Sequence, residues 1–303
     1  MLANFFSKSK PVNFMIIIML FLVYYIIDML LYRSLDVGLE VLFHIPMYLV
    51  IFFLFNFIIT KNKLTKDDSY AFLLFVIGLG CLPHLDLNLI TLMEYFLLFL
   101  FLRKVYSIRW QRLNEKLFDS GLWLGVLFLI SPEYVLYSLL LLLALILFVK
   151  VTFRALFIPI LGFLTPLLLF FTYHFWLDST RTFYELFTWQ LSTGIESYNT
   201  LFYVVSLSFF GAITGLATLL RSGRVFSVSN RFKSIWILLL VHLLISLIVV
   251  LFVPEKDGSE LILVLIPATI VIANWLRSVQ LKNMVTFILL LFLLVSFGVH
   301  FIA

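Results

Sequence analysis

The segment PVNFMIIIMLFLVYYIIDMLL (residues 11–31) decides the class of this chain. Its apolar run is long enough to cross the hydrocarbon core of a bilayer as one helix, which takes about 20 residues. The run is too long for a signal-peptide core and has no A-x-A-like cleavage site, so we expect it to remain as the first membrane helix. Apolar residues make up 63% of the 303 residues and charged residues 12%, a balance that excludes a soluble globular domain.

The basic residues between the apolar runs predict the topology. When the runs are read as alternating membrane crossings, all but three of the 21 Lys and Arg residues fall on one side; the exceptions are Arg33, Arg181 and Lys256. Most acidic residues fall on the other side. Because cytoplasmic loops retain Lys and Arg, the basic side is predicted to be cytoplasmic. The net charge of +5 therefore reflects topology, and no nucleic-acid partner is expected.

This pattern predicts an all-α, polytopic membrane helix bundle of about eleven transmembrane helices, with a cytoplasmic N-terminus and an outer C-terminus. We expect residues 1–303 to form a single transmembrane domain: the first seven helices in 1–177, an outer interfacial segment at 178–199, and the last four helices in 200–303. The predicted crossings are 12–32, 38–59, 70–83, 87–102, 117–131, 134–150, 155–177, 200–220, 234–253, 260–276 and 283–301.

Two of these predicted crossings are short. Residues 70–83 and 117–131 provide about 21 Å of helix, whereas the hydrocarbon core is about 30 Å thick. Each ends at a proline and an acid, in LPHLD and SPE, and a longer apolar run follows, which suggests a hairpin repeat of 70–104 and 117–150. Shortened, proline-interrupted segments indicate a buried site, because irregular backbone at membrane depth needs protein or a wet cavity around it. Tilted helices in a thinned bilayer are the alternative.

Carboxylates gather at the predicted outer ends of the helices. A carboxylate just below the outer surface can act as a general base or hold a divalent cation, so a cation cofactor and no cofactor both remain open. The candidate catalytic residues are Asp28, Asp36, Asp86 and Glu133. The candidate ligands for a substrate phosphate are Arg33, Arg181 and His84. The alternative is that the acids are solvated loop residues. No group of residues has the sequence spacing of a metal site.

Glu94 is the one acid in the middle of a predicted crossing. An ionised carboxylate there costs about 2.5–3.5 kcal/mol even on lenient insertion scales, so we expect Glu94 to face the bundle and find a partner. Asn56 and His242 are the candidate partners in other crossings. Glu94 would then serve a proton relay, a substrate contact, or a structural hydrogen bond of its protonated form.

Three further patterns predict local structure. Thr182-x-x-Glu185 is a capping box that would begin a short interfacial helix. Gly211-x-x-x-Gly215 predicts a helix that packs closely against a neighbour. The basic segment 103–116 predicts an anchor on the inner leaflet. The sequence contains no nucleotide-binding, zinc-hydrolase or serine-hydrolase motif.

The stretches MLANFFSKSKPVNF, NFIITKNKLTKDDSYAFLL and KLFDSGLWLGVLFLISPEY resemble a family of integral membrane proteins from Bacteroidota that has no assigned activity. More loosely, residues 117–177 resemble the middle of the C-type membrane glycosyltransferases, which use sugars carried on polyprenyl phosphate. That resemblance implies that Asp28 or Asp36 stands for the acid of the first outer loop, and Asp86 for that of the second. Those enzymes have a long first outer loop, which this chain lacks.

The leading prediction is therefore a protein of the inner membrane that resembles a glycosyltransferase and handles polyprenyl-linked sugars on the outer face. Asp86 would be the base or metal-associated acid, with Asp28 or Asp36 assisting. One alternative is a non-catalytic structural or assembly subunit that binds other membrane proteins of the cell envelope. Another is a transporter or lipid flippase in which Glu94 titrates. Membrane lipids are expected partners in every case.

Overall fold

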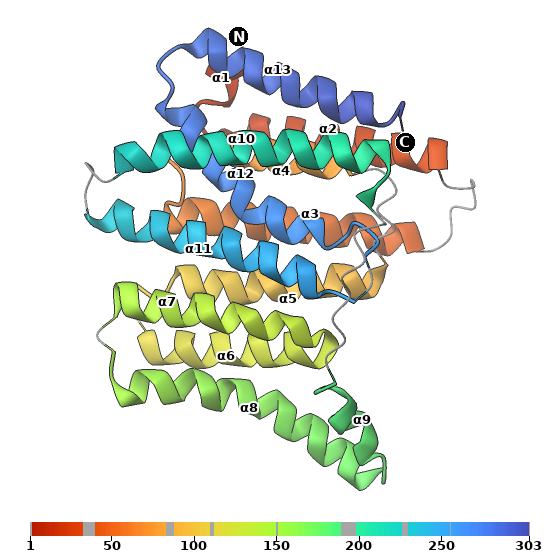
Figure 1. The fold of residues 1–303 in the computed structure, drawn as a ribbon, viewed down its shortest axis with the longest axis vertical. Helices are drawn as coiled ribbons and strands as arrows, with labels where there is room; N and C mark the ends of the chain where they lie inside the picture. The colour runs from red at the N-terminus through yellow and green to blue at the C-terminus, as the bar shows by residue number, and fades with distance from the viewer. Residues whose placement is uncertain are drawn as a thin grey trace. The chain divides into compact units, whose positions relative to one another are not determined.

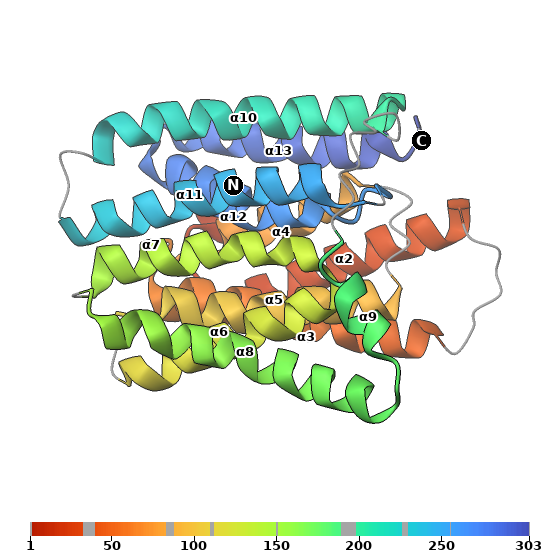
Figure 2. The same ribbon diagram turned by 60° about the horizontal axis from the view of Figure 1, so that its bottom comes forward.

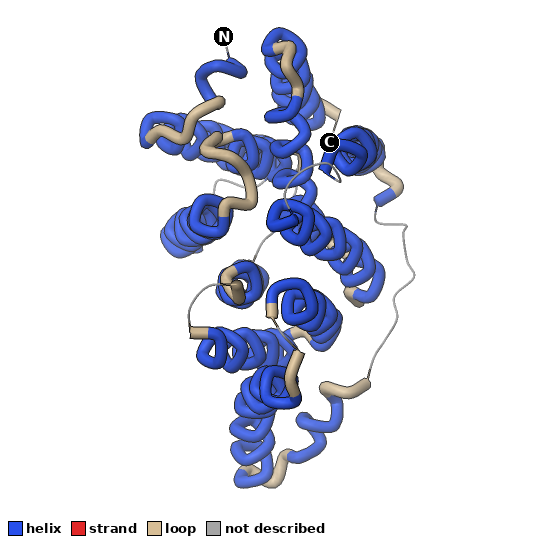
Figure 3. Tube along the Cα trace, turned by 90° about the vertical axis from the view of Figure 1, so that its left-hand side faces the viewer, coloured by secondary structure: helices blue, strands red, loops and turns tan. Residues whose placement is uncertain are grey.

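The computed structural model describes residues 2–32, 40–82, 88–109, 112–149, 151–188, 198–225, 230–254 and 256–302. Throughout these ranges the regular elements are helices, and none of them contains a strand (Figure 3). The prediction of an all-α chain is confirmed. The chain divides into two compact units: Met1–Leu87, Gly194–Leu240 and Lys256–Ala303 form unit 1, and Asn88–Thr193 and Val241–Glu255 form unit 2. Whether 1–303 acts as the single predicted transmembrane domain stays a prediction.

Unit 1 is built around the short helix α4, whose residues are all buried. Helix α4 packs against α12, α2, α13 and α3, and α12 is itself mostly buried. The helices of unit 1 are α1 (Leu2–Phe6), α2 (Pro11–Tyr32), α3 (Glu40–Asn62), α4 (Tyr70–Gly80), α10 (Leu201–Val225), the first part of α11 (Asn230–Phe252), α12 (Leu261–Ser278) and α13 (Lys282–Val299). Backbone groups in an apolar medium must bond internally, which makes the helix the form that these apolar runs adopt.

Unit 2 is built around α6, which packs against α5 on one side and most extensively against α8. Helices α6 and α8 lie side by side in both Figure 1 and Figure 2. The elements of unit 2 are α5 (Leu89–Tyr106), α6 (Leu113–Ile130), the 3-10 helix η1 (Pro132–Tyr137), α7 (Ser138–Phe148), α8 (Phe153–Trp176), α9 (Thr180–Glu185) and the last part of α11.

Glycines bring the backbones of α6 and α8 into direct contact. A Cβ added at Gly121 would lie 2.0 Å from the carbonyl oxygen of Pro159, and one at Gly162 would lie 2.2 Å from that of Phe118. Gly125, one turn along α6, is equally confined, with the carbonyl oxygen of Phe163 at 2.4 Å. Small residues four apart permit such close approach of membrane helices. Gly121-x-x-x-Gly125 is therefore the close-packing motif of unit 2.

The predicted close-packing motif at Gly211 and Gly215 is wrong. A Cβ added at either glycine of α10 would meet no atom within 4 Å, and both residues are exposed. The spacing of small residues is common by chance, and whether a neighbour approaches them depends on tertiary packing, which one helix alone does not reveal. The sequence thus predicted the right kind of contact on the wrong helix.

Seven of the described helices are long and apolar enough to cross a membrane, so the chain is a multi-pass membrane protein. The seven are α2, α3, α8, α10, α11, α12 and α13. Each of the eleven predicted crossings corresponds to a helix or, for 134–150, to η1 and α7 together. Helices α5 and α6 have 18 residues each but carry more charge, and α4 and η1–α7 are shorter. The count of eleven crossings and the orientation of the termini stay predictions.

Only one of the two predicted short helices is short. Helix α4 has 11 residues, about 16 Å of helix, as the sequence indicated. Helix α6 begins at Leu113 rather than at residue 117 and has 18 residues, about 27 Å. The charges of Glu115 and Lys116 predict a loop, but both residues belong to the first turn of the helix. The hairpin repeat of 70–104 and 117–150 stays a prediction.

Candidate functional site

Four predicted site residues lie outside the described part of the chain: Arg33, Asp36, His84 and Asp86. Their proposed roles, and the predicted buried turn at Asp86, stay predictions. The other two candidate acids are described. Asp28 lies near the end of α2 in unit 1, and Glu133 lies in the first turn of η1 in unit 2, where it is half-buried.

Asp28 lines a small pocket in unit 1. His44 of α3 and His300, which follows α13, also line it, and both histidines are buried. The remaining lining residues are Phe21, Tyr24, Tyr25, Tyr48, Leu79, Gly80 and Leu82. The cavity volume is about 50 Å³, enough for a few water molecules at roughly 10–15 Å³ each. A carboxylate, two imidazoles and three phenols around this space can hold a proton, water or one small polar group of a larger molecule.

Tyr24 forms one wall of this pocket and is fixed in place from two sides. Its hydroxyl lies 2.5 Å from Ser296 Oγ of α13, and its ring stacks on His300 with 6.1 Å between ring centroids. A Cβ added at Gly80 would lie 2.7 Å from the ring of Tyr24, so the glycine makes room for the ring. The pocket therefore rests on contacts among α2, α4 and α13 that the sequence did not indicate.

Glu94 of α5 accepts hydrogen bonds from the start of the segment that joins α6 to α7. Ser131 Oγ donates to Glu94 Oε1 at 2.8 Å, and the Tyr134 hydroxyl donates to Oε2 at 3.3 Å. The sequence suggested two other partners. His242 bonds to Tyr106, and a contact of Glu94 with Asn56 stays a prediction. A hydroxyl group can donate a hydrogen bond to a carboxylate just as an amide or an imidazole can. The hydroxyl donors to Glu94 come from the neighbouring segment.

His242 of α11 is buried in unit 2 between two tyrosines. Its Nδ1 lies 2.8 Å from the Tyr106 hydroxyl, and the ring of Tyr137 meets it edge-on with centroids 5.8 Å apart. The Tyr137 hydroxyl lies 3.0 Å from Ser246 Oγ, one turn further along α11. In the part of the chain that the structure describes, His242 Nε2 has no hydrogen-bond partner. A buried polar group left in this state costs about 1–3 kcal/mol, and such a group in a native protein requires an explanation.

These side chains form a line along α5, which we call the Glu94–Tyr106 line; its members are Glu94, Tyr134, Tyr137, His242 and Tyr106. Its two ends are 12 residues apart on α5, about 18 Å of a hydrocarbon core about 30 Å thick. Hydrogen bonds join Glu94 to Tyr134 and His242 to Tyr106. Ring contacts, at 6.0 Å and 5.8 Å between centroids, join the members in the middle. A proton can pass these two contacts only if a side chain moves or a water molecule bridges them.

The 3-10 geometry of η1 aligns part of this line. Ser131, Tyr134 and Tyr137 are three residues apart, and side chains with that spacing eclipse one another on a 3-10 helix. Sequence reasoning missed these residues, as well as Tyr106 and Ser246. The hydroxyls at intervals of three on either side of Pro132 were a usable signal, because proline starts such a turn without losing a needed hydrogen bond.

Arg181, a predicted phosphate ligand, lies exposed on α9 and pairs with Glu185 through Nε and Oε1 at 3.0 Å. The predicted capping box is wrong, because α9 begins at Thr180 and Thr182 lies inside it. The Glu185 carboxylate bonds to Arg181, one turn earlier, rather than to the helix start. The predicted short helix after Asp178 does exist, and it packs against the end of α8 (Figure 2).

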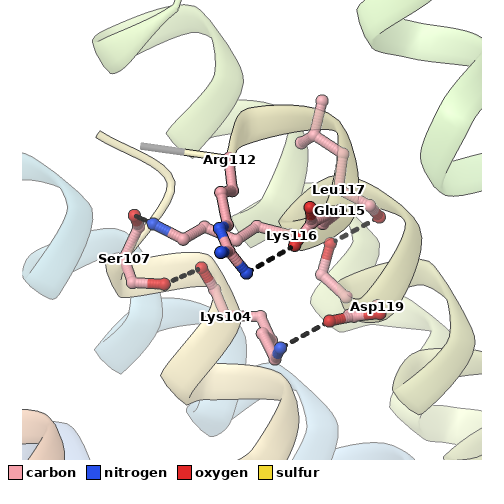
Figure 4. Close-up of polar contacts among 8 residues, drawn as sticks. Lys104, Ser107, Arg112, Glu115, Lys116, Leu117 and Asp119 are labelled. Carbon is pink, nitrogen blue, oxygen red and sulfur yellow. Dashed lines mark hydrogen bonds and ion pairs between the residues drawn. The ribbon is translucent and has the colours of Figure 1, made fainter. Parts of the chain in front are cut away.

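Charges at the α5–α6 connection pair with one another. Figure 4 shows Lys104 of α5 bonded to Asp119 of α6, and Lys116 Nζ donates to the Ser107 carbonyl at 2.7 Å. Arg112, in the left-handed region with φ 62°, precedes α6 and lies 3.6 Å from the Glu115 carboxylate. The basic segment 103–116 was expected to be an inner-leaflet anchor. In the structure Leu113–Lys116 form the first turn of α6, and the bases with intramolecular partners include Lys104, Arg112 and Lys116. Whether the segment also anchors the chain on the inner leaflet stays a prediction.

The buried acid Asp68 lies outside the membrane helices of unit 1. Its Oδ1 accepts a hydrogen bond from Tyr70 N at 3.3 Å, and burial raises its pKa to about 7, against the attraction of Arg277. The same connection holds the N-terminal segment: Ser69 N donates to the Phe6 carbonyl at 3.0 Å, and Asn13 Nδ2 donates to the Lys8 carbonyl at 2.8 Å. Asp68 therefore belongs to a structural junction.

No group of three or more His, Cys, Asp or Glu residues in the described ranges is arranged to hold a metal ion. Comparison with protein-family models, with curated proteins and with solved structures found no match to this chain.

Proposed function

We propose that this multi-pass membrane protein is a transporter in which unit 2 carries protons along the Glu94–Tyr106 line. The observation that carries the proposal is an acid and a histidine, both within helices of unit 2, linked through tyrosines over about 18 Å of α5. Ionisable groups at membrane depth are costly and mark ion or proton pathways. Glu94 would accept the proton at one end, and His242 would pass it to Tyr106 at the other.

Two features support His242 as a relay rather than as packing. Its Nδ1 is bonded while its Nε2 has no partner in the described chain, so one nitrogen can take up a proton as the other releases one. A fixed structural role would favour partners on both nitrogens. The Tyr137 hydroxyl is held by Ser246, one turn from His242 on α11, and its ring meets the imidazole edge-on, so that a bridging water molecule would link the two groups.

The test is proton flux into proteoliposomes that contain the purified chain. A potassium gradient with valinomycin supplies the driving potential, and a trapped pH-sensitive dye reports the flux. We expect Glu94→Gln to lower the flux by about a hundredfold, the low end of what a positioned proton acceptor contributes. His242→Phe, which keeps a ring of similar size, should lower it similarly.

The matched control is Glu115→Gln, which makes the same chemical change at an exposed position of α6. It should leave the flux unchanged. Equal flux from the wild type and from Glu94→Gln, with both folded, would show that the line conducts no protons.

A second candidate function rests on the Asp28 pocket. We propose as the alternative a glycosyltransferase-like activity of an inner-membrane protein on polyprenyl-linked sugars, with Asp28 as the assisting acid. The pocket supports it by placing Asp28 beside His44 and His300, which can share a proton with a carboxylate. The space of about 50 Å³ would admit one polar group of a sugar or phosphate rather than a whole donor.

For this alternative, Asp28→Asn should fail to restore envelope glycolipids in a strain that lacks the gene, because asparagine cannot accept the proton. Asp178→Asn, on the connection between α8 and α9, is the control and should restore them fully. Full restoration by both variants would remove the enzyme proposal. If membrane proteins also co-purified with each variant, a structural or assembly subunit of an envelope complex would explain the chain better.

A further inference from the structure

Unit 2 contains an apolar groove that the proposed proton line does not use. Helix α6 forms its floor at Gly121 and Leu124, η1 and α7 form one wall, and α8 forms the other. Leu142 of α7 and Ile160 of α8 are representative of the walls, and among the described lining residues only Ser138 has a polar side chain. The cavity volume is about 380 Å³.

The groove follows from how α6 and α8 pack. Backbone contact at Gly121 and Pro159 holds α8 against α6, while α7 packs chiefly against η1 and α5. Helices α7 and α8 follow one another in the chain, yet their facing sides leave the floor of α6 open between them. The groove is thus a fixed feature of the packing and requires no movement of a side chain to form.

The groove is continuous with the apolar outer surface of both helices. Leu142 and Ile160 line it and are still 47% and 50% exposed. Leu139 and Leu161 beside them are exposed without lining it. In a membrane-spanning bundle such a surface contacts lipid chains, and an apolar cavity does not hold water. A cavity of about 150 Å³ already binds benzene, so this larger groove has room for a segment of a hydrocarbon chain.

A basic residue lies close to one end of the groove. Arg154 is in the first turn of α8, two residues before the lining residue Leu156, and its side chain is exposed. Within the described chain it enters neither a hydrogen bond nor an ion pair. A guanidinium group at the end of a membrane helix attracts the phosphate of an anionic lipid. Apolar walls that end at a free positive charge match a lipid tail that ends at a negative headgroup.

We propose that this groove binds one acyl chain of an anionic glycerophospholipid, with its phosphate on Arg154. The test uses a phosphatidylglycerol probe with a photoreactive diazirine in its acyl chain, added to the purified full-length protein. Cross-linked peptides are then identified by mass spectrometry. Labelling should concentrate on the two walls, Val135–Leu145 and Leu156–Phe163.

Ser138→Phe fills the groove with a ring and should remove most of this labelling. Leu139→Phe adds a ring at the neighbouring exposed position, outside the groove, and is the matched control. Arg154→Gln should lower the preference for phosphatidylglycerol over phosphatidylcholine by about fivefold, the effect of one basic residue near a lipid surface. Lys282→Gln, on α13 of unit 1, should leave that preference unchanged.

Two outcomes would overturn the proposal. One is labelling spread evenly over all exposed helix faces, or lowered equally by Ser138→Phe and Leu139→Phe in folded protein. The other is cross-linking of two copies of the chain through α7 and α8, because the groove would then be an interface between copies.

Discussion

Gly121→Ala should lower the thermal unfolding temperature of the purified protein by roughly 5–10 °C, because a side chain there collides with backbone. The added Cβ would lie 2.0 Å from the Pro159 carbonyl oxygen and 2.8 Å from its carbonyl carbon. A backbone carbonyl in a helix cannot rotate away, so α6 and α8 must separate. That pair is the most extensive contact between helices in unit 2, and separation loses packing well beyond Gly121.

The control is Gly211→Ala on α10, where the added Cβ would meet no atom within 4 Å. Alanine favours a helix over glycine by up to about 1 kcal/mol, so this variant should be as stable as the wild type or slightly more so. The two substitutions are identical in chemistry, and only Gly121→Ala should lower the unfolding temperature. Equal unfolding temperatures for both variants would show that α6 and α8 do not meet at Gly121.

The stability of unit 1 should fall as the pH rises from about 4 to about 7, in part because of Asp68. Burial raises the pKa of this acid from 3.8 to about 7 in the folded protein, so the folded state keeps its proton after the unfolded chain has lost it. Between those values the unfolded state binds fewer protons, and the free energy of unfolding decreases as the pH rises. Above about pH 7 both states are ionised and the contribution becomes flat. The full effect is on the order of a few kcal/mol.

Asp68→Asn should be close to the wild type in stability at pH 5 and more stable at pH 8, because the amide is never charged. Asp67→Asn removes an exposed carboxylate that adds only a smaller contribution to the raised pKa of Asp68, so it should keep most of the pH dependence. A smaller slope should remain in Asp68→Asn, since burial also raises the pKa of Glu260 to about 7. Thermal unfolding of each purified variant at several pH values measures how its stability depends on pH. If the stability of Asp68→Asn fell with pH as steeply as that of the wild type, Asp68 would be ruled out as a source of the pH dependence.

The helices of this chain were predictable because one physical requirement decides them. An apolar run at membrane depth must bond its own backbone, so runs such as 11–31 and 234–253 become helices whatever lies around them. The ends of helices that carry charged residues were less predictable. The start of α6 was placed at residue 117 because Glu115 and Lys116 resemble a loop, whereas their pairing with residues of the α5–α6 connection allows them to lie in the helix.

The candidate site was predictable only in part, for a related reason. The sequence identified Glu94 and His242 because a polar or ionisable side chain in a membrane helix costs free energy. This cost can be recognised without knowing which residues lie nearby. Their partners come from other helices, and one sequence contains no record of which helices adjoin. The same limit explains the glycines: Gly121 and Gly211 have the same local pattern, and only tertiary packing separates them.

Cys81 is the only cysteine of the chain, and it is buried at the end of α4, where its carbonyl accepts a hydrogen bond from Ser206. A burial this complete makes the wild-type chain unreactive toward thiol reagents in water, so any cysteine introduced elsewhere is the sole accessible label. A cysteine introduced at the exposed position of Asn88 would then show, by its reaction with a membrane-impermeant thiol reagent, on which side of the membrane the chain lies after α4. The buried thiol thus supplies the background against which the number of crossings can be counted directly.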